Sequence, residues 1–440
     1  MKNNLYLREE KINRTDIHSA VFFALMTLII AVQPFTFYLN LPIAIALLIN
    51  WIAEWDWKAK RQRIDTPQKK VLFCVFLSIF AIYMIGIFYS TNTQRALAEL
   101  EYKLWFLVAP LTIFTAPPER LNNKKILFLA RIFLISLLLL ILTNFSIAVW
   151  KCIEAPRYYY FVYIHLSNFM HPAYSAMHVS TGLIVAFHLF LHQNKQRQWR
   201  FLTTISMIVF PIYIFLLQSK AGLLALLILF ILMSLYLINR RKRRLLPSLV
   251  FVSLLILIPT TLFFVVPEPY NRLKPAVRQL VSDDRDKDAS DGTGLRLAVW
   301  QASWKVAMQH PLFGVGPGDV RDELMKEYEK SDNIHLTEHQ FNCHNQYLQT
   351  FVGLGLAGLL VLLCYFCIPL GYAIRHKKIT YILFLLLILI NLFSESMFER
   401  KAGGDFIAIT GVLFCYYFLW KKSPLTVSSH SSPRLQQSSV

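Results

Sequence analysis

The residues best suited to chemistry surround one long polar insert, 267–345, which separates two sets of apolar segments. Arg296 begins a stretch of helical periodicity inside the insert, and His344 stands where the chain returns to apolar sequence. An arginine binds a phosphate group through two parallel hydrogen bonds, and a histidine titrates near neutral pH and can take a proton from a hydroxyl. Arg296 is therefore suited to bind a lipid-linked phosphate donor, and His344 is suited to act as a general base. His344 could instead be an interfacial residue that caps a helix.

Further candidates lie in the connectors that should share the outer side with the insert. Lys220 occupies a short hairpin between two apolar segments, where a charge is costly unless it is paired or functional. His171 precedes another apolar segment and either shapes a substrate entrance or is structural. We expect Glu395 and Glu399, in the last of these connectors, to form ion pairs with cations of the insert.

The composition indicates which elements position these residues. Of 440 residues, 55% are hydrophobic and only 16% are charged, whereas soluble domains carry about a quarter charged residues. Apolar runs near 18 residues are long enough to cross a bilayer, and lipid allows only helices or closed barrels there. We expect twelve transmembrane helices, of which the second and fourth are short, at 18–37, 40–53, 71–89, 103–116, 125–149, 174–192, 201–217, 221–238, 245–266, 346–370, 379–393 and 404–420.

The predicted fold is therefore an all-α integral membrane protein with about twelve transmembrane helices and one large outer loop that contains short amphipathic helices. We divide the chain into four parts: 1–266 with helices one to nine, the loop 267–345, 346–422 with helices ten to twelve, and a polar tail, 423–440, expected to be disordered.

The net charge of +19 is explained by membrane topology rather than by nucleic-acid binding. Basic residues concentrate in alternate connectors, at 58–70, 120–125, 195–200, 240–244 and 375–378. Cytoplasmic loops carry this excess of lysine and arginine. The pattern predicts that both termini are cytoplasmic and that the insert lies on the opposite face of the membrane.

Within the insert, the sequence predicts two short helices joined by a glycine-rich turn. Apolar residues recur at helical spacing over 295–310, Pro311 ends that helix, and Asp319 is a suitable N-cap for a second helix that ends near Lys330. The turn at 313–318 is most simply a connector. A disulfide between Cys152 and Cys343, both expected on the outer side, stays open because two cysteines do not define a framework.

The order of these motifs resembles the O-antigen ligase and polymerase superfamily. The resemblance rests on the hairpin 218–222 and on Arg296, Trp300, Pro311, Gly314, Gly316, His344, Asn345, Tyr347, Leu348, Gln349, Gly355 and Gly358. Two positions depart from the family pattern. Lys220 stands where arginine is usual, which loses the planar fork, and Gly353 or Leu354 replaces an acidic residue.

The resemblance implies glycosyl transfer at the periplasmic face of the bacterial inner membrane. The donor would be a glycan on undecaprenyl diphosphate and the acceptor a sugar hydroxyl of lipid A–core, with no metal and no cofactor. Catalysis would fall to His344 on the acceptor and Arg296 on the diphosphate. Binding of the diphosphate or glycan would involve Lys220, Arg272, Lys274, Arg278, His171 and Asn345, of which Arg272, Lys274 and Arg278 are the weaker candidates.

Three alternatives stay open. A polymerase of the same superfamily would join repeat units on the same carrier, but only the insert is a large outer loop, while 150–173 is modest, and this favours a ligase. A protein hydroxyl could replace the lipid acceptor. A transporter of lipid-linked sugars would need paired polar residues at mid-bilayer depth, and the predicted helix centres are almost free of charge.

Overall fold

A computed structural model describes residues 14–192, 196–240, 294–330 and 334–421. Within these ranges the chain forms helices and no strand. The predicted ninth membrane helix, the tail 423–440 and the candidate cations Arg272, Lys274 and Arg278 lie outside the described residues.

Eight described helices are long and apolar enough to cross a membrane. They are α1 (Arg14–Val32), α4 (Pro67–Ile87), α7 (Asn123–Glu154), α9 (Pro172–His192), α10 (Arg197–Leu216), α11 (Lys220–Arg240), α17 (Gln346–Arg375) and α19 (Lys401–Cys415), which continues through the π-helix η3 (Tyr416–Trp420). Two shorter apolar helices, α2 (Asn40–Ala53) and α18 (Ile379–Ser394), match predicted runs. The predicted all-helical class is therefore confirmed for the described residues, and the count of twelve membrane helices stays a prediction.

The fourth predicted run, 103–116, differs from a full span. It forms only the ten-residue α6 (Trp105–Phe114), which contains Pro110 and is largely buried. A span requires about 20 residues, so this segment is a core element packed against α19 and α4. The remaining short elements are α3 (Trp57–Gln62), α5 (Thr93–Tyr102), η1 (Tyr158–Phe161), α8 (Tyr163–Leu166) and η2 (Met397–Glu399).

Local sequence explains where several helices begin. The Thr66 side chain accepts a hydrogen bond from the backbone of Lys69, and Pro67 occupies the first position of α4. Asn122 caps α7 in the same way. These caps lie at the ends of apolar runs, so hydrophobicity and capping together set the bounds of the spans.

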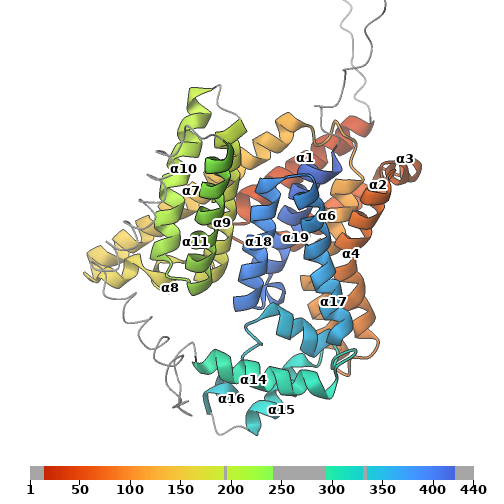
Figure 1. The fold of residues 1–440 in the computed structure, drawn as a ribbon, viewed down its shortest axis with the longest axis vertical. Helices are drawn as coiled ribbons and strands as arrows, with labels where there is room; N and C mark the ends of the chain where they lie inside the picture. The colour runs from red at the N-terminus through yellow and green to blue at the C-terminus, as the bar shows by residue number, and fades with distance from the viewer. Residues whose placement is uncertain (1–13, 193–195, 241–293, 331–333, 422–440) are drawn as a thin grey trace, which may run out of the picture.

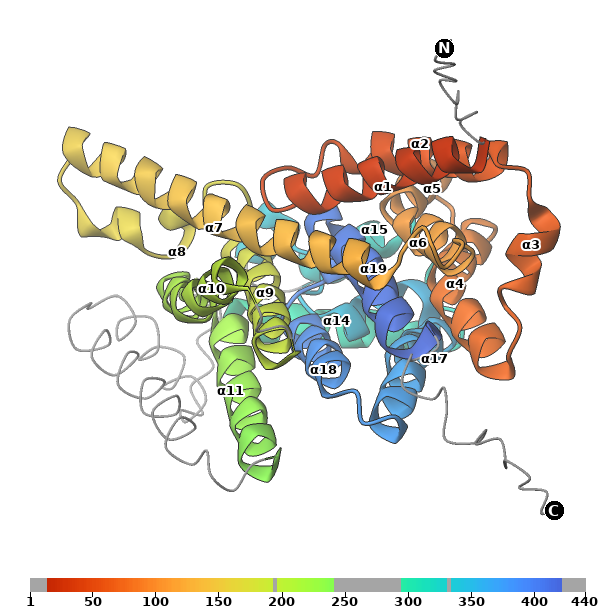
Figure 2. The same cartoon turned by 90° about the horizontal axis from the view of Figure 1, so that it is seen from above.

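Packing places α9 at the centre of one half of the bundle. It contacts α10, α18, α11 and α7, and most of its residues are buried. Figure 2 shows α9, α10 and α11 grouped on one side, α4 and α6 on the other, and α18 and α19 between them. The ends of α17 and α18 and the start of α19 can therefore meet near the middle of the molecule.

In its described residues, 294–330 and 334–345, the insert forms three helices at one end of this bundle: α14 (Gly294–Gln309), α15 (Val320–Glu329) and α16 (Ile334–His339) (Figure 1). The two predicted helices are confirmed to within one residue, and α16 is an addition. Their shared core includes Val299, Leu324, Tyr328 and Leu336 and continues into Val352 of α17. The described part of the insert thus packs against α17 and shares a hydrophobic core with it. Cys152 and Cys343 are both free thiols in the structure.

The glycine-rich turn is more than a connector. Gly355 has φ +62° and breaks α17, and the turn enters this break through hydrogen bonds from Gly316 N to Gly353 O (2.9 Å) and from Leu356 N to Pro311 O (2.8 Å). A Cβ on Gly355 would lie 2.4 Å from the carbonyl carbon of Leu312. Glycine is therefore required there for both conformation and space.

Asp319 stands at the N-cap position of α15, but its side chain makes no capping bond. The carboxylate instead accepts hydrogen bonds from the backbone N–H groups of Thr91 (2.6 Å) and Asn92 (2.7 Å). The predicted local cap is thus a tertiary contact between the insert and the segment before α5.

Candidate functional site

One carboxylate joins the two residues that the sequence singles out most strongly. Arg296 lies in the first turn of α14, His344 lies two residues before the start of α17, and Glu395 follows the last turn of α18. Glu395 Oε1 pairs with Arg296 Nη2, and Glu395 Oε2 lies 3.0 Å from His344 Nδ1. The predicted ion pair between Glu395 and a cation of the insert is confirmed, and the cation is Arg296.

The three side chains differ in exposure in a way that suits a site. Glu395 is 9% exposed, whereas Arg296 is 32% and His344 is 26% exposed. The carboxylate of Glu395 is therefore buried, whereas the side chains of Arg296 and His344 remain partly accessible to solvent. A guanidinium has five N–H donors, so Arg296 can hold Glu395 and still offer donors to an anion.

The electrostatics of Glu395 determine the tautomer of His344. Burial alone would raise the pKa of the Glu395 carboxyl, but the hydrogen bond from His344 and the positive charges of Arg296, His344 and His171 outweigh it, so the pKa lies below its usual value. An ionised carboxylate only accepts hydrogen bonds, so Nδ1 of His344 carries the proton. In the neutral form of the ring, Nε2 then carries the free lone pair that a general base requires.

The backbone also sets His344 apart. Its φ of +44° is in the left-handed region, which residues other than glycine seldom adopt. Its N–H donates to Asn342 Oδ1 at 3.0 Å. Strained residues of this kind persist where the surrounding structure holds them, often at functional sites. The conformation turns the chain sharply before α17 and places the imidazole against Glu395.

Asn345, not His344, caps α17. Its Oδ1 accepts hydrogen bonds from the backbone N–H groups of Tyr347 (2.9 Å) and Leu348 (3.2 Å), and its side chain is buried. The capping alternative for His344 is therefore taken by its neighbour. A contact between Asn345 and a glycan stays a prediction.

A second set of hydrogen bonds locks the loop that carries Glu395. Asn345 N donates to Ser396 Oγ (3.2 Å), and Gln346 Oε1 accepts from the backbone N–H of Phe398 (2.7 Å). Ser396 and Gln346 are fully buried. The sequence marked Asn345 and Gln346 only by their place directly after His344. No local pattern linked these two residues to Ser396.

Glu399 has a different partner from the one expected. Lys103 Nζ lies 3.3 Å from Glu399 Oε1 and 2.5 Å from Glu99 Oε2. The predicted ion-pair role of Glu399 is confirmed, but its partner Lys103 is not a cation of the insert. Burial and the neighbouring Glu99 carboxylate raise the pKa of Glu399. The ion pairs of Lys103 with Glu99 and Glu399 hold η2, which begins two residues after Glu395, against the end of α5.

His171 and Lys220 lie at the same end of neighbouring helices. His171 precedes α9 and is exposed, and its positive charge lowers the pKa of Glu395. Lys220 is the exposed first residue of α11. A Cβ on Gly222 would lie 2.6 Å from the Cβ of Ala176, so the starts of α11 and α9 are in close contact. The functional roles of Lys220 and His171 stay predictions.

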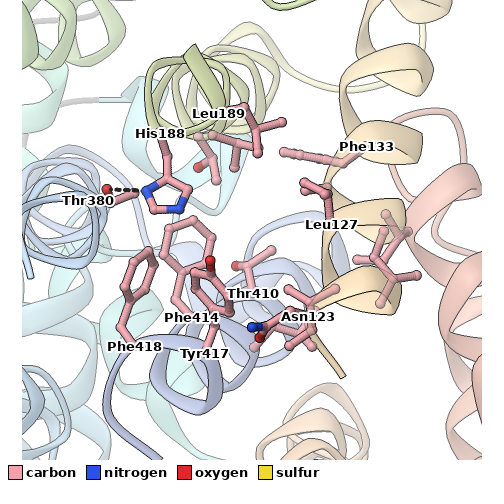
Figure 3. Close-up of a pocket in the computed structure, with 17 residues that line it drawn as sticks. Asn123, Leu127, Phe133, His188, Leu189, Thr380, Thr410, Phe414, Tyr417 and Phe418 are labelled. Atoms are coloured by element: carbon pink, nitrogen blue, oxygen red, sulfur yellow. Dashed lines mark hydrogen bonds between the residues drawn. The ribbon is translucent and has the colours of Figure 1, made fainter. Parts of the chain in front are cut away.

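An apolar pocket of about 100 Å³ lies elsewhere, between α7, α9, α18 and α19 (Figure 3). His188 Nδ1 lies 2.9 Å from Thr380 Oγ1 at its wall. Thr380 and Glu395 stand at opposite ends of α18, about 22 Å apart along the helix axis. The pocket is therefore separate from the group formed by Arg296, Glu395 and His344.

Comparison with known proteins shows a similarity over part of the chain. Residues 205–363 match the family model described as O-Antigen ligase, a range that contains Arg296 and His344 and ends before Glu395. A segment of 140 residues is 29% identical to an uncharacterized protein of Haemophilus influenzae. It covers 32% of this chain and 34% of that protein, so the match spans about a third of the relative's length.

Together with the apolar helices, the family match indicates a bacterial membrane protein. Residues 205–363 therefore carry the similarity of this chain to the O-antigen ligase family.

Proposed function

We propose that the protein transfers a glycan from undecaprenyl diphosphate to a sugar hydroxyl of lipid A–core at the periplasmic face of the inner membrane. The observation that carries this proposal is the joining of Arg296 and His344 by the buried carboxylate of Glu395, in a chain with an O-antigen ligase match. The alternation of basic connectors supports a periplasmic position for the insert.

In the proposed reaction, the acceptor hydroxyl gives its proton to Nε2 of His344 while its oxygen attacks the anomeric carbon of the donor sugar. The bond between that carbon and the diphosphate oxygen breaks, and undecaprenyl diphosphate leaves with the electron pair. Glu395 holds the imidazole in the correct tautomer and stabilises the imidazolium that forms, as carboxylates do for catalytic histidines in other enzymes.

Arg296 supplies the complementary charge. Negative charge grows on the diphosphate as the glycosidic bond breaks, and a fixed cation beside it lowers the barrier. Arg296 is held by Glu395 and remains partly exposed, so it is oriented before the donor arrives. Lys220 at the start of α11, with His171 at the start of α9, would extend this cationic surface.

A polymerase reaction uses the same donor chemistry with a different acceptor. We favour the ligase because 267–345 is the one large polar insert in the sequence. A protein hydroxyl in place of the lipid acceptor would leave the proposed roles of His344 and Arg296 unchanged.

The test is surface-polysaccharide profiling of a deletion strain complemented with wild type, His344→Ala, Arg296→Ala or Glu395→Gln. His310→Ala is a matched control because His310 is an exposed histidine of the same insert. For a ligase, deletion removes polymer from lipid A–core while long chains accumulate on the carrier, and the three site variants fail at normal membrane levels. Accumulation of only single repeat units on the carrier in the deletion strain would identify a polymerase. Full complementation by all three variants would overturn the site assignment.

A further inference from the structure

A cluster of metal-ligating side chains lies on α16, away from the group around Glu395. His335, Glu338 and His339 each offer one ligand atom, and these atoms all lie within 4.8 Å of one another. Positions i, i+3 and i+4 share one face of a helix. Two imidazoles and a carboxylate form a ligand set that suits Zn²⁺ and related divalent transition metals. We propose that His335, Glu338 and His339 form an accessory transition-metal site on the insert.

The hydrogen bond of His339 supports this assignment independently of the clustering. His339 Nδ1 lies 3.2 Å from the carbonyl oxygen of His335. A carbonyl oxygen only accepts, so Nδ1 carries the proton and Nε2 keeps its lone pair for a metal. Metal-ligating histidines usually donate their second N–H to a carbonyl or carboxylate in this way.

The ring of His339 is also held in place. It stacks on Phe341 with a centroid distance of 5.3 Å and an interplanar angle of 4°. Leu336 is buried in the core of the insert, which anchors α16 and leaves the His335 and Glu338 side chains 38% and 57% exposed. A tetrahedral zinc site places ligand atoms roughly 3.4 Å apart, from bond lengths near 2.1 Å, so small side-chain rotations would close the cluster on an ion.

The site has a physical link to His344. The ring centroid of Phe341 lies 5.6 Å from that of His344 as well as 5.3 Å from that of His339, and the carbonyl of Phe341 accepts a hydrogen bond from Tyr328 at 3.1 Å. A metal on α16 fixes His339 and thereby restrains the segment that leads into His344. This bracing role does not depend on the glycan-transfer reaction.

The experiment measures Zn²⁺ binding to the full-length protein, purified in nanodiscs without a polyhistidine tag, by competition with a chromophoric chelator. Wild type should bind one equivalent. His335→Ala and His339→Ala should each weaken binding by at least about tenfold. Mutation of a residue that only hydrogen-bonds to a metal ligand already lowers metal affinity by about that factor. Glu338→Gln should weaken it less, and His310→Ala should match wild type. Absence of Zn²⁺ binding by wild type, or wild-type affinity in the double variant His335→Ala/His339→Ala, would overturn the proposal.

A second measurement tests the bracing role. Amide hydrogen exchange across 334–344 should slow when Zn²⁺ is added to wild type and stay unchanged in His339→Ala. Size-exclusion elution and membrane yield equal to wild type confirm that the variants fold. Equal exchange rates with and without saturating Zn²⁺ in wild type would contradict the link to His344.

Discussion

His344 and Glu395 are hydrogen-bonded across 51 residues of sequence, with 3.0 Å between Nδ1 and Oε2. The same carboxylate pairs with Arg296, 99 residues away. This arrangement makes a buried acid the common support of a candidate base and a candidate phosphate-binding cation.

Replacing Glu395 with glutamine keeps the size of the side chain and removes its charge. The imidazole of His344 then loses the acceptor that fixes its tautomer, so we expect transfer to slow by about a hundred- to ten-thousand-fold. The measurement is the rate of transfer from a purified lipid-linked donor. Glu101→Gln is the control, because Glu101 pairs with Lys401 at the surface and its loss should leave the rate unchanged. A Glu395→Gln rate within twofold of wild type would contradict the orienting role.

The Arg296→Lys variant separates charge from geometry. Lysine keeps the positive charge but lacks the planar fork that can hold Glu395 and a phosphate together. We expect kcat to fall for Arg296→Lys and to fall further for Arg296→Ala, by about a hundred- to a thousand-fold as for other transition-state donors. Steady-state kinetics with varied donor provide the test. Equal kcat values for lysine and alanine would show that charge at this position has no role.

The pH dependence of stability follows from the lowered pKa of Glu395. A carboxyl whose pKa is lower in the folded than in the unfolded state, where it is about 4.3, stabilises the fold above that pH. The contribution disappears as the pH falls through the folded-state pKa. We expect the thermal midpoint of wild type to lie above that of Glu395→Gln from about pH 8 to pH 5, and this difference to shrink below about pH 4.3. A difference that vanishes between pH 8 and pH 5 would contradict the lowered pKa.

The break in α17 offers a matched pair of glycine substitutions. Gly355→Ala forces an L-residue into φ +62° and places a Cβ 2.4 Å from Leu312, so we expect a loss of about 1–3 kcal/mol or more. Gly371→Ala lies in the same helix with nothing within 4 Å of the added Cβ and should stabilise by up to about 1 kcal/mol. Thermal unfolding in the same detergent compares the two. Equal midpoints would show that the turn at 313–318 does not depend on Gly355.

Gln346 is expected to act as a positioning residue. Gln346→Leu removes the acceptor for the N–H of Phe398 and leaves a buried donor unpaired, which costs about 1–3 kcal/mol. The loop that carries Glu395 should loosen, so kcat should fall while the KM for the donor changes little. Gln301→Leu on the exposed face of α14 is the control. A rise in KM without a change in kcat would place Gln346 in donor binding instead.

The sequence by itself determined the helical class and the position of most spans, because an apolar run long enough to cross a bilayer has no alternative to a helix. It also determined α14 and α15 of the insert to within one residue, since periodicity and Pro311 are local signals, whereas α16 was not predicted. Arg296 and His344 were visible as candidates for the same reason: residue type and position in the chain were enough to single them out.

Only the tertiary structure decided how these elements combine. Glu395 could be predicted to find a cation of the insert, but not that it would hold Arg296 and His344 at once, because that depends on the packing of α14, α17 and α18. Asp319 reads as a local cap, yet its carboxylate is used across 228 residues by Thr91. Gly355 stands in the sequence as one glycine of the family motif, yet it opens α17 for the glycine-rich turn. In each case the partner is distant in sequence. A buried polar group requires a hydrogen-bond partner, but the sequence around it does not indicate which distant residue that partner will be.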